Sequence, residues 1–125
     1  MHIEYHKHWS THLNRYMELK IYGHAGKPVI VFPSARGTFY QFEDFGMVEA
    51  VREFIEQGRI QLYTLSSNDH ETWLADDWIC LPDRGRNYQR YDEYVIQEVV
   101  PLIEQQSGRE GGFAATGCSM GAYHA

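Results

Sequence analysis

The pattern of hydrophobic and polar residues predicts a series of strands. Arg15–His24 alternates between the two kinds of side chain, as a strand with one buried face does. Pro28–Phe32 is a continuous hydrophobic run, which is typical of strands covered on both faces in parallel sheets. Arg59–Leu65 predicts a further strand and Gly111–Gly117 a short one of small residues, whereas His2–Ser10 alternates only loosely.

Helical periodicity occurs twice along the chain. The first apolar stripe, followed by Gly58 as the residue after the helix, consists of Met47, Val48, Val51, Phe54 and Ile55. The second consists of Tyr91, Tyr94, Val95, Val99, Leu102 and Ile103. Pro101 lies inside this second helix and is expected to kink its last turn before the helix ends ahead of Gly108. A long loop from Ser66 to about Asn87 is expected before it.

The order of these elements predicts the fold class. Two antiparallel-type strands come first, and then strand, helix, strand, helix, strand and turn follow one another. Such alternation implies an α/β fold with a mostly parallel sheet, helices on both faces and antiparallel strands at the start. The 125 residues fit a single domain, residues 1–125, without a repeat or a linker.

Composition and charge exclude several classes of protein. The net charge of −6, with acidic and basic residues interspersed, argues against nucleic acid or an anionic membrane as a partner. No hydrophobic run is long enough to span a bilayer, and the start MHIEYHKHWS lacks the order of a signal peptide. Cys80 and Cys118 do not make a disulfide framework. We therefore expect a cytoplasmic protein.

The stretch FAATGCSMGAYHA contains a Gly-x-Ser-x-Gly pattern centred on Ser119. The pattern alone is weak, and Ser119 could simply turn a glycine-rich corner. Here, however, it follows a predicted buried strand and precedes a segment that can begin a helix, which is the context of a strained nucleophile turn. Gly117 and Gly121 lie where strand and helix come too close for a side chain.

Such a turn would serve acyl-transfer chemistry. It lifts the Ser119 hydroxyl clear of the sheet and aims the backbone N–H of Met120 at the developing oxyanion. A second donor is expected from the loop after Pro28–Phe32, where Ser34, Ala35 and Arg36 are the nearest candidates.

Three blocks of the sequence resemble a known family. PVIVFPSARGTFYQFEDFGM, GRIQLYTLSSNDHETW and TGCSMGAYHA are similar to the esterase D-like branch of the α/β-hydrolases, which is related to feruloyl-type esterases and mycolyltransferases. The resemblance covers nearly all of the chain. It implies a serine nucleophile at Ser119, with oxyanion donors from Met120 and the loop at residues 34–37, and roughly as much chain again. The loop departs from the His-Gly-Gly-Gly form of lipases, which leaves the donating amide open.

The partners of the serine are expected beyond residue 125, because in this fold the acid and the histidine follow the nucleophile. His124 is interpreted as a helix residue that packs on its neighbours. His70 and Trp73 are candidates for substrate binding, and Trp73 could equally be a core residue. We expect the chain to be the amino-terminal half of a longer enzyme, with little or no turnover by itself, rather than a short chain that lost activity.

The function predicted is carboxylic ester hydrolysis through an acyl-enzyme on Ser119, acting on a small-molecule ester. Acyl transfer to an alcohol and a non-catalytic interaction module remain alternatives. The chemistry needs no cofactor and no metal, because side chains and backbone dipoles suffice. A complementary carboxy-terminal half or a second copy is the expected protein partner, because the strand before Ser119 would otherwise be an unpaired edge.

Other residues carry weaker signals. The even-numbered histidines His2, His6, His8 and His12 are expected to line a solvated strand face rather than a metal site. Cys118 is expected to point into the fold, and Glu43 and Asp44 to cap the coming helix. The stretch Asp76–Asn87 could be a pocket wall or a charged surface loop.

Overall fold

The computed structural model describes all residues from Met1 to Ala125. Its five strands form one sheet with the spatial order β1-β2-β4-β3-β5. Their bounds are β1 Ile3–Ser10, β2 Arg15–Tyr22, β3 Lys27–Phe32, β4 Ile60–Leu65 and β5 Ala114–Gly117. Strands β4, β3 and β5 run parallel to one another, while β1 and β2 form an antiparallel hairpin that joins β4 through β2. The predicted α/β class, with antiparallel strands at the start, is confirmed.

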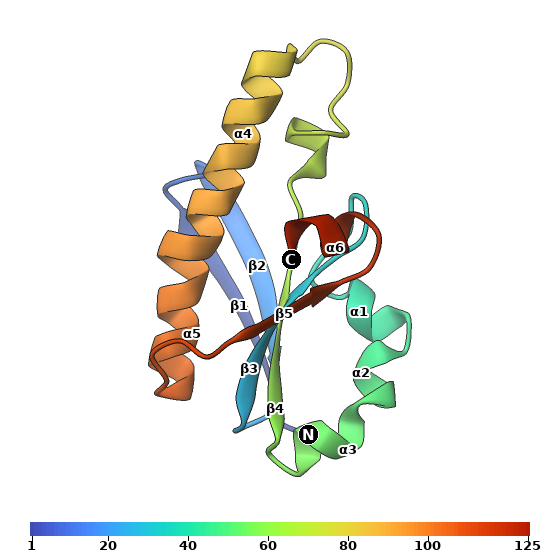
Figure 1. The fold of residues 1–125 in the computed structure, drawn as a ribbon, viewed down its shortest axis with the longest axis vertical. Coiled ribbons are helices and arrows are strands. Elements are labelled where there is room, and N and C mark those ends of the chain that lie inside the picture. The colour runs from blue at the N-terminus through green and yellow to red at the C-terminus, as the bar shows by residue number, and fades with distance from the viewer.

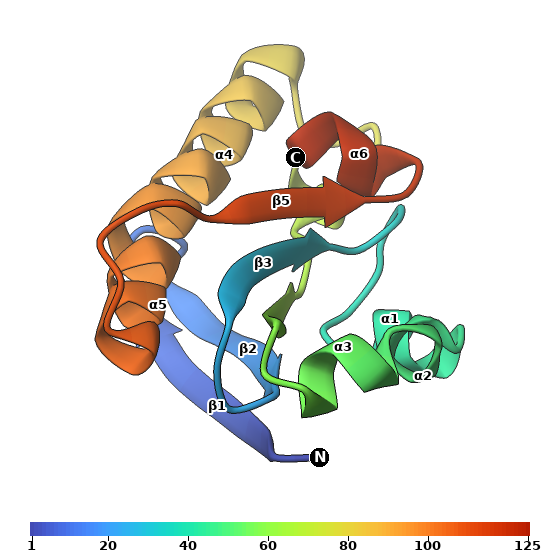
Figure 2. The same ribbon diagram turned by 60° about the horizontal axis from the view of Figure 1, so that its bottom comes forward.

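Helices cover both faces of this sheet (Figure 1, Figure 2). Three short helices follow β3: α1 Gln41–Asp44, α2 Met47–Ala50 and α3 Arg52–Glu56. The other face carries the long helical segment before β5 and the short helix α6, Met120–His124. The long segment consists of α4 Leu81–Tyr94, the π-helix Val95–Val99 and α5 Val100–Ser107, and a 3-10 turn, η1 Asp69–Glu71, precedes it.

Two hydrophobic cores result from the alternation of side chains along the central strands. Ile30 and Phe32 of β3 pack with Tyr63 of β4 on the side of α4 and α5. Val31 and its neighbours on β2 and β4 pack on the opposite side against Val48 and Ile55. Both faces of β3 are therefore buried, as its unbroken hydrophobic run predicts.

The first strand is more regular than its sequence suggests. His2–Ser10 alternates loosely, yet β1 pairs with β2 along its whole length, from Ile3 opposite Tyr22 to Ser10 opposite Arg15. The expectation of a solvated histidine face is wrong for His6 and His8, which are half-buried, and His8 stacks on Tyr94 at 5.8 Å. His2 is exposed as expected, and the half-buried His12 lies in the turn after β1. Tyr5 and Trp9, on the odd-numbered side, are exposed instead.

The helices differ from prediction at their boundaries. The single helix expected around Val48–Ile55 is divided into α2 and α3 at Val51, which has φ −109°. Gly58, with φ 70°, follows α3 as expected. The long loop ends at Cys80 rather than near Asn87, because Pro82 lies in the first turn of α4, where its missing N–H costs nothing. The irregularity near Pro101 is a π turn before the proline rather than in the last turn.

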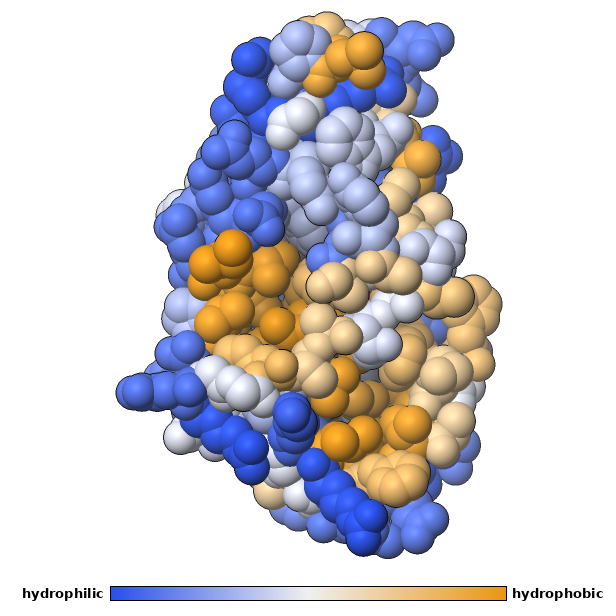
Figure 3. All heavy atoms as spheres, in the orientation of Figure 1, coloured by the Kyte–Doolittle hydropathy of each residue, from blue (hydrophilic) through white to orange (hydrophobic).

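β5 forms one of the two edges of the sheet, opposite the edge formed by β1. β5 pairs only with β3, and its outer side has no neighbouring strand. Figure 3 shows hydrophobic residues gathered across this view, over β5 and the helices α1–α3. None of the helices is both long and apolar enough to cross a membrane.

Candidate active site

The chain reverses sharply at Ser119, between β5 and α6. Ser119 has φ 58° and ψ −121°, one of three residues other than glycine with positive φ, and its side chain is exposed. A Cβ on Gly117 would lie 2.3 Å from the backbone of Gly121, and one on Gly121 would lie 2.4 Å from the carbonyl oxygen of Phe32. The strained reversal expected from the glycine spacing is therefore present, and its Gly121 packs directly against the backbone at the end of β3.

A tight turn at residues 34–37 follows β3 beside this reversal. It is called the oxyanion turn below, after the role that the sequence analysis expects of it. The Gly37 amide donates to the Ser34 carbonyl at 2.8 Å, and Arg36 at the third position has φ 57°, as a type II turn requires. The Gly37 site cannot hold a side chain, since a Cβ would lie 2.5 Å from Pro33.

The three amides suggested as second donor differ in their partners. The Ser34 amide donates to Gln41 Oε1 at 2.8 Å, and the Arg36 amide donates to Asp69 Oδ2 at 2.9 Å. Ala35 is exposed and its amide has no acceptor within the protein. The Met120 amide opens α6, and the first amides of a helix have no intrahelical acceptor. Two free N–H groups, of Ala35 and Met120, thus lie on the segments that flank Ser119.

A buried pair beneath the reversal joins Asp69 to His124. Asp69 Oδ1 lies 3.1 Å from His124 Nε2, and the two side chains are 0% and 2% exposed. Burial raises the pKa of the Asp69 carboxyl, but hydrogen bonds from His124 and the Arg36 amide outweigh burial and hold this pKa below its usual value. Since an ionised carboxylate can only accept, we assign the proton of His124 to Nε2.

His124 is not placed to act as a base for Ser119. Its ring lies among Phe32, Tyr88 and Tyr91, and its Nδ1 is buried without a hydrogen-bond partner. The Ser119 hydroxyl makes no hydrogen bond to it. This environment agrees with the interpretation of His124 as a packing residue of the helix.

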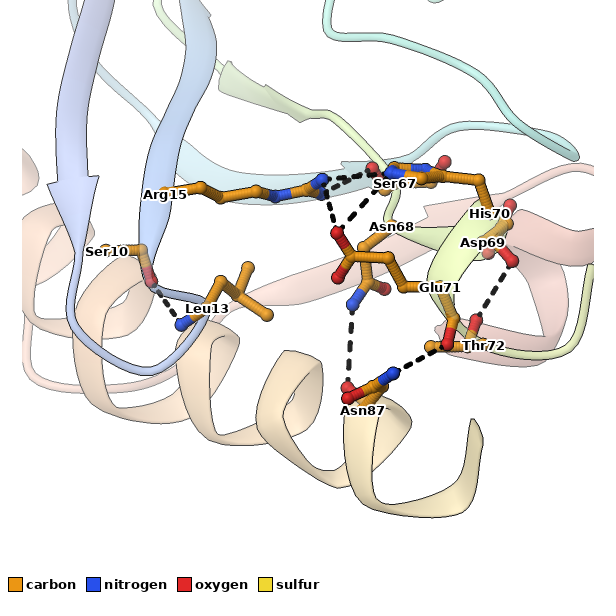
Figure 4. Close-up of polar contacts among 10 residues, drawn as sticks. All are labelled: Ser10, Leu13, Arg15, Ser67, Asn68, Asp69, His70, Glu71, Thr72 and Asn87. Carbon is orange, nitrogen blue, oxygen red and sulfur yellow. Dashed lines mark hydrogen bonds and ion pairs between the residues drawn. The ribbon is translucent and has the colours of Figure 1, made fainter. Parts of the chain in front are cut away.

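The structure separates the two residues suggested for substrate binding. Trp73 is 40% exposed, packs on Tyr88 at 5.3 Å, and lines an open hollow of about 300 Å³ with Met120 and Tyr123. His70 is 59% exposed and contacts Arg15 and Glu71 at 3.1 and 3.5 Å (Figure 4). Trp73 therefore lies beside the reversal, and His70 does not join it.

Three further predictions need correction or completion. Cys118 is exposed and lines an apolar cavity of about 380 Å³ with Phe42 and Phe45, because no element covers that side of β5. Glu43 does not cap a helix: its carboxylate binds Lys20 at 2.8 Å and the Tyr22 hydroxyl at 2.7 Å. Asp44 makes no capping hydrogen bond either, because the residue before α2 is Gly46.

The remaining sequence signals give no second site. Asp83 and Arg84 lie in the first turn of α4 rather than in a loop. No group of three or more His, Cys, Asp and Glu side chains lies close enough to hold a metal ion.

Asp69 and Tyr123 belong to this site although the sequence analysis assigned them no role, and Asp69 is the buried one of the two. The position of Asp69 is informative. It opens η1, four residues after the end of β4, at the end of the sheet where ligands bind in open α/β folds, and this position was the available signal. Its burial and its hydrogen bonds to Arg36 and His124 arise only when the chain folds, so the sequence does not reveal them.

A parallel strand, a serine at positive φ and a helix packed on the neighbouring strand form the strand–turn–helix arrangement that is typical of the α/β-hydrolase fold. The sequence matches the family model described as "Putative esterase" over residues 10–125, and the chain belongs to this family. No curated protein matches the sequence.

Solved structures share the fold. A ferulic acid esterase superposes with a TM-score of 0.67 at 14% identity, over 96% of this chain and 51% of its own. For S-formylglutathione hydrolases from Agrobacterium tumefaciens and Staphylococcus aureus the TM-scores are 0.66 and 0.65, at 21% and 11% identity. These two matches cover 97% and 98% of this chain and 50% and 51% of theirs. The chain therefore spans about half the length of the structures it matches.

Proposed function

We propose that the protein is a serine-dependent carboxylic ester hydrolase with Ser119 as its nucleophile. The observation that carries the proposal is the exposed serine held at φ 58° between β5 and α6, beside two unpaired amides. Strain of this kind persists only where surrounding packing enforces it, and it presents the hydroxyl at the edge of the sheet. Membership of the esterase family supports the same chemistry.

The reaction follows from these groups. The Ser119 oxygen attacks the ester carbonyl carbon while a base takes its proton, and the carbonyl oxygen becomes an oxyanion that the Met120 and Ala35 amides stabilise. The C–O bond to the alcohol then breaks, the alcohol leaves with the proton, and Ser119 remains acylated. Water attacks the acyl-enzyme, releases the acid and returns the proton to Ser119. We assign the base and its orienting acid to parts of the protein outside residues 1–125.

The hollow beside the serine suggests which part of the ester this chain binds. Its walls are Trp73, Met120 and Tyr123, and polar side chains contribute nothing to the lining. An apolar or aromatic group of a small-molecule ester would bury its surface there, next to the reacting carbonyl.

A covering partner for β5 is part of this proposal. The outer edge of β5 and the apolar cavity at Cys118, Phe42 and Phe45 are uncovered, and matched structures are twice as long. We assign this surface to further chain of the same protein, with a second copy of the chain as the alternative occupant.

A fluorophosphonate probe tests the nucleophile in the full-length protein. We expect the wild type to be labelled and to hydrolyse p-nitrophenyl esters, and Ser119→Ala to abolish labelling and lower kcat about 10³-fold or more. Ser107→Ala, at the end of α5, is the matched control and should behave as wild type. Labelling that persists in Ser119→Ala, or its absence in the folded wild type, would refute the assignment.

A further inference from the structure

Asp69 contacts two segments that the proposed chemistry must hold together. One carboxylate oxygen accepts the Arg36 amide of the oxyanion turn at 2.9 Å, and the other faces His124 Nε2 of α6 at 3.1 Å. The oxyanion turn follows β3, and α6 follows Ser119. A single buried side chain thus connects the loop donor of the proposed oxyanion hole to the helix of the nucleophile.

The oxyanion turn needs such an anchor. Arg36 has φ 57°, a conformation that side chains with a Cβ adopt only when neighbouring contacts enforce it. The hydrogen bond from its amide to the Asp69 carboxylate is charge-assisted, and the Arg36 guanidinium adds a bond to the Leu74 carbonyl at 3.0 Å. The peptide that carries the Ala35 N–H directly precedes this anchored residue, so its direction depends on the same contacts.

Asp69 itself is held from several sides. Its backbone carbonyl accepts a hydrogen bond from the Leu74 amide at 3.0 Å. Two residues later, the Glu71 carboxylate accepts a bond from the Arg15 guanidinium at 3.1 Å, and the Glu71 carbonyl accepts one from the Asn87 side-chain amide at 2.9 Å. Figure 4 shows this segment fixed between β2 and α4. The carboxylate is therefore a fixed point for the two segments that it joins, a loop and a five-residue helix.

We propose that Asp69 is a positioning residue that, with His124, locks the oxyanion turn onto the nucleophile helix and so directs the Ala35 N–H at the oxyanion. The inference rests on the proposed function. Asp69 touches neither Ser119 nor the hollow at Trp73, so its effect must fall on stabilisation of the transition state rather than on substrate binding.

Steady-state kinetics of Asp69→Ala and Asp69→Asn in the full-length protein test this role. Asp69→Ala should lower kcat about 10²-fold, as loss of one oxyanion donor does, with KM changed less than about threefold. Asp69→Asn keeps the volume and one acceptor for the Arg36 amide but loses the charge, so kcat should fall only about three- to tenfold. Asp44→Ala, which removes an exposed carboxylate from α1, is the matched control.

Inhibition by phenylboronic acid separates positioning from a structural role. Its tetrahedral adduct with Ser119 places an oxygen in the oxyanion hole, so its inhibition constant should rise in Asp69→Ala in parallel with the loss of kcat. Inhibition by the carboxylic acid product, a ground-state ligand, should stay unchanged. Thermal unfolding of each variant shows which ones are folded at the assay temperature.

The outcomes are distinguishable. A folded Asp69→Ala or Asp69→Asn with kcat within twofold of wild type, or a loss confined to KM, overturns the inference while the proposed function stands. If Asp69→Ala does not fold, Asp69→Asn decides. A wild type that neither hydrolyses esters nor reacts with fluorophosphonate overturns the proposed function and this inference together.

Discussion

At the scale of single residues, the reversal at Ser119 depends on two glycines that have no room for a methyl group. Gly117 and Gly121 face each other across the turn, and Gly121 also faces the Phe32 and Pro33 carbonyl oxygens. Backbone atoms cannot move aside as the end of a flexible side chain can. Their requirement for glycine is thus steric, and it explains why a short pattern in the sequence located the turn.

We predict that Gly121→Ala destabilises the fold by about 1–3 kcal/mol, because its Cβ would lie 2.4 Å from the Phe32 carbonyl oxygen. The free energy of unfolding of the full-length protein in urea measures this loss. Gly85→Ala is the matched control: it has open space in α4 and should be neutral or stabilising by up to about 1 kcal/mol. Equal stability of Gly121→Ala and wild type would contradict the packing argument.

Residue patterns located the serine turn but not the polar pair under it. The spacing of Gly117 and Gly121 is local, so the sequence alone reveals it. The contact between Asp69 and His124 joins residues 55 positions apart, and a buried aspartate looks like any loop aspartate in the sequence. The same limit applies to the oxyanion turn: the sequence named Ser34, Ala35 and Arg36, and only their hydrogen bonds distinguish the free amide.

At the scale of elements, the β1–β2 hairpin is clamped to the π-helix by Glu98. Its carboxylate accepts the Ser10 hydroxyl at 2.7 Å and lies 2.7 Å from His12 Nδ1. Burial raises the pKa of Glu98, but the bonds from Ser10 and His12 outweigh it and lower this pKa. The hydrogen bond to Glu98 raises the pKa of His12. The pair is therefore most stabilising when both groups are charged.

We predict that the stability lost in Glu98→Gln depends on pH in two directions. The lowered Glu98 pKa contributes stability above about pH 4.5, which is lost as pH falls through the folded pKa. The raised His12 pKa contributes stability below about pH 6.5, which is lost as pH rises through the folded pKa. The difference in unfolding free energy from wild type should peak between these values, near pH 5.5.

Urea unfolding at pH 3.5, 5.5 and 8.5 measures this profile. Asp92→Asn, an exposed change on α4, is the control and should show no such peak. A difference for Glu98→Gln that is the same at all three values would contradict the charged pair.

Element boundaries were less predictable than element types. Each strand and both helical regions lie where the hydrophobic pattern places them, because that pattern reports burial directly. The start of α4 was missed by about seven residues, since its first turns are polar and contribute no stripe. The strand β1 was only weakly indicated by the sequence, because its exposed face carries the apolar residues Tyr5 and Trp9, which interrupt the alternation of hydrophobic and polar positions.

At the scale of the whole molecule, the surface beside β5 is an exposed apolar surface that should behave like a hydrophobic core open to solvent. Phe45, 73% exposed, and Met47 lie at the cavity beside Cys118, next to β5, whose outer side has no neighbouring strand. Apolar surface of this kind binds hydrophobic dyes and promotes association.

We predict that residues 1–125 expressed alone bind a hydrophobic dye strongly and self-associate as concentration rises, and that the full-length protein does neither. Dye fluorescence and sedimentation measure these properties. Phe45→Glu in residues 1–125 should weaken dye binding, whereas Trp78→Glu, an exposed residue outside the cavity, should not. A monomeric, dye-free fragment would show that this surface needs no cover.

The close contact of Gly121 with the end of β3 has a consequence for how substrate preference can vary. The serine turn and the segment after β3 are in contact through main-chain atoms, which cannot move aside as side chains can. The two segments therefore form one rigid unit. The stretch that carries Trp73 lies outside this unit and is joined to it by the Asp69 carboxylate and by the bond from Arg36 to the Leu74 carbonyl. Under the proposed function, exchanging the Trp73 side chain, which makes neither of these bonds, would change which molecules enter without changing the reacting geometry.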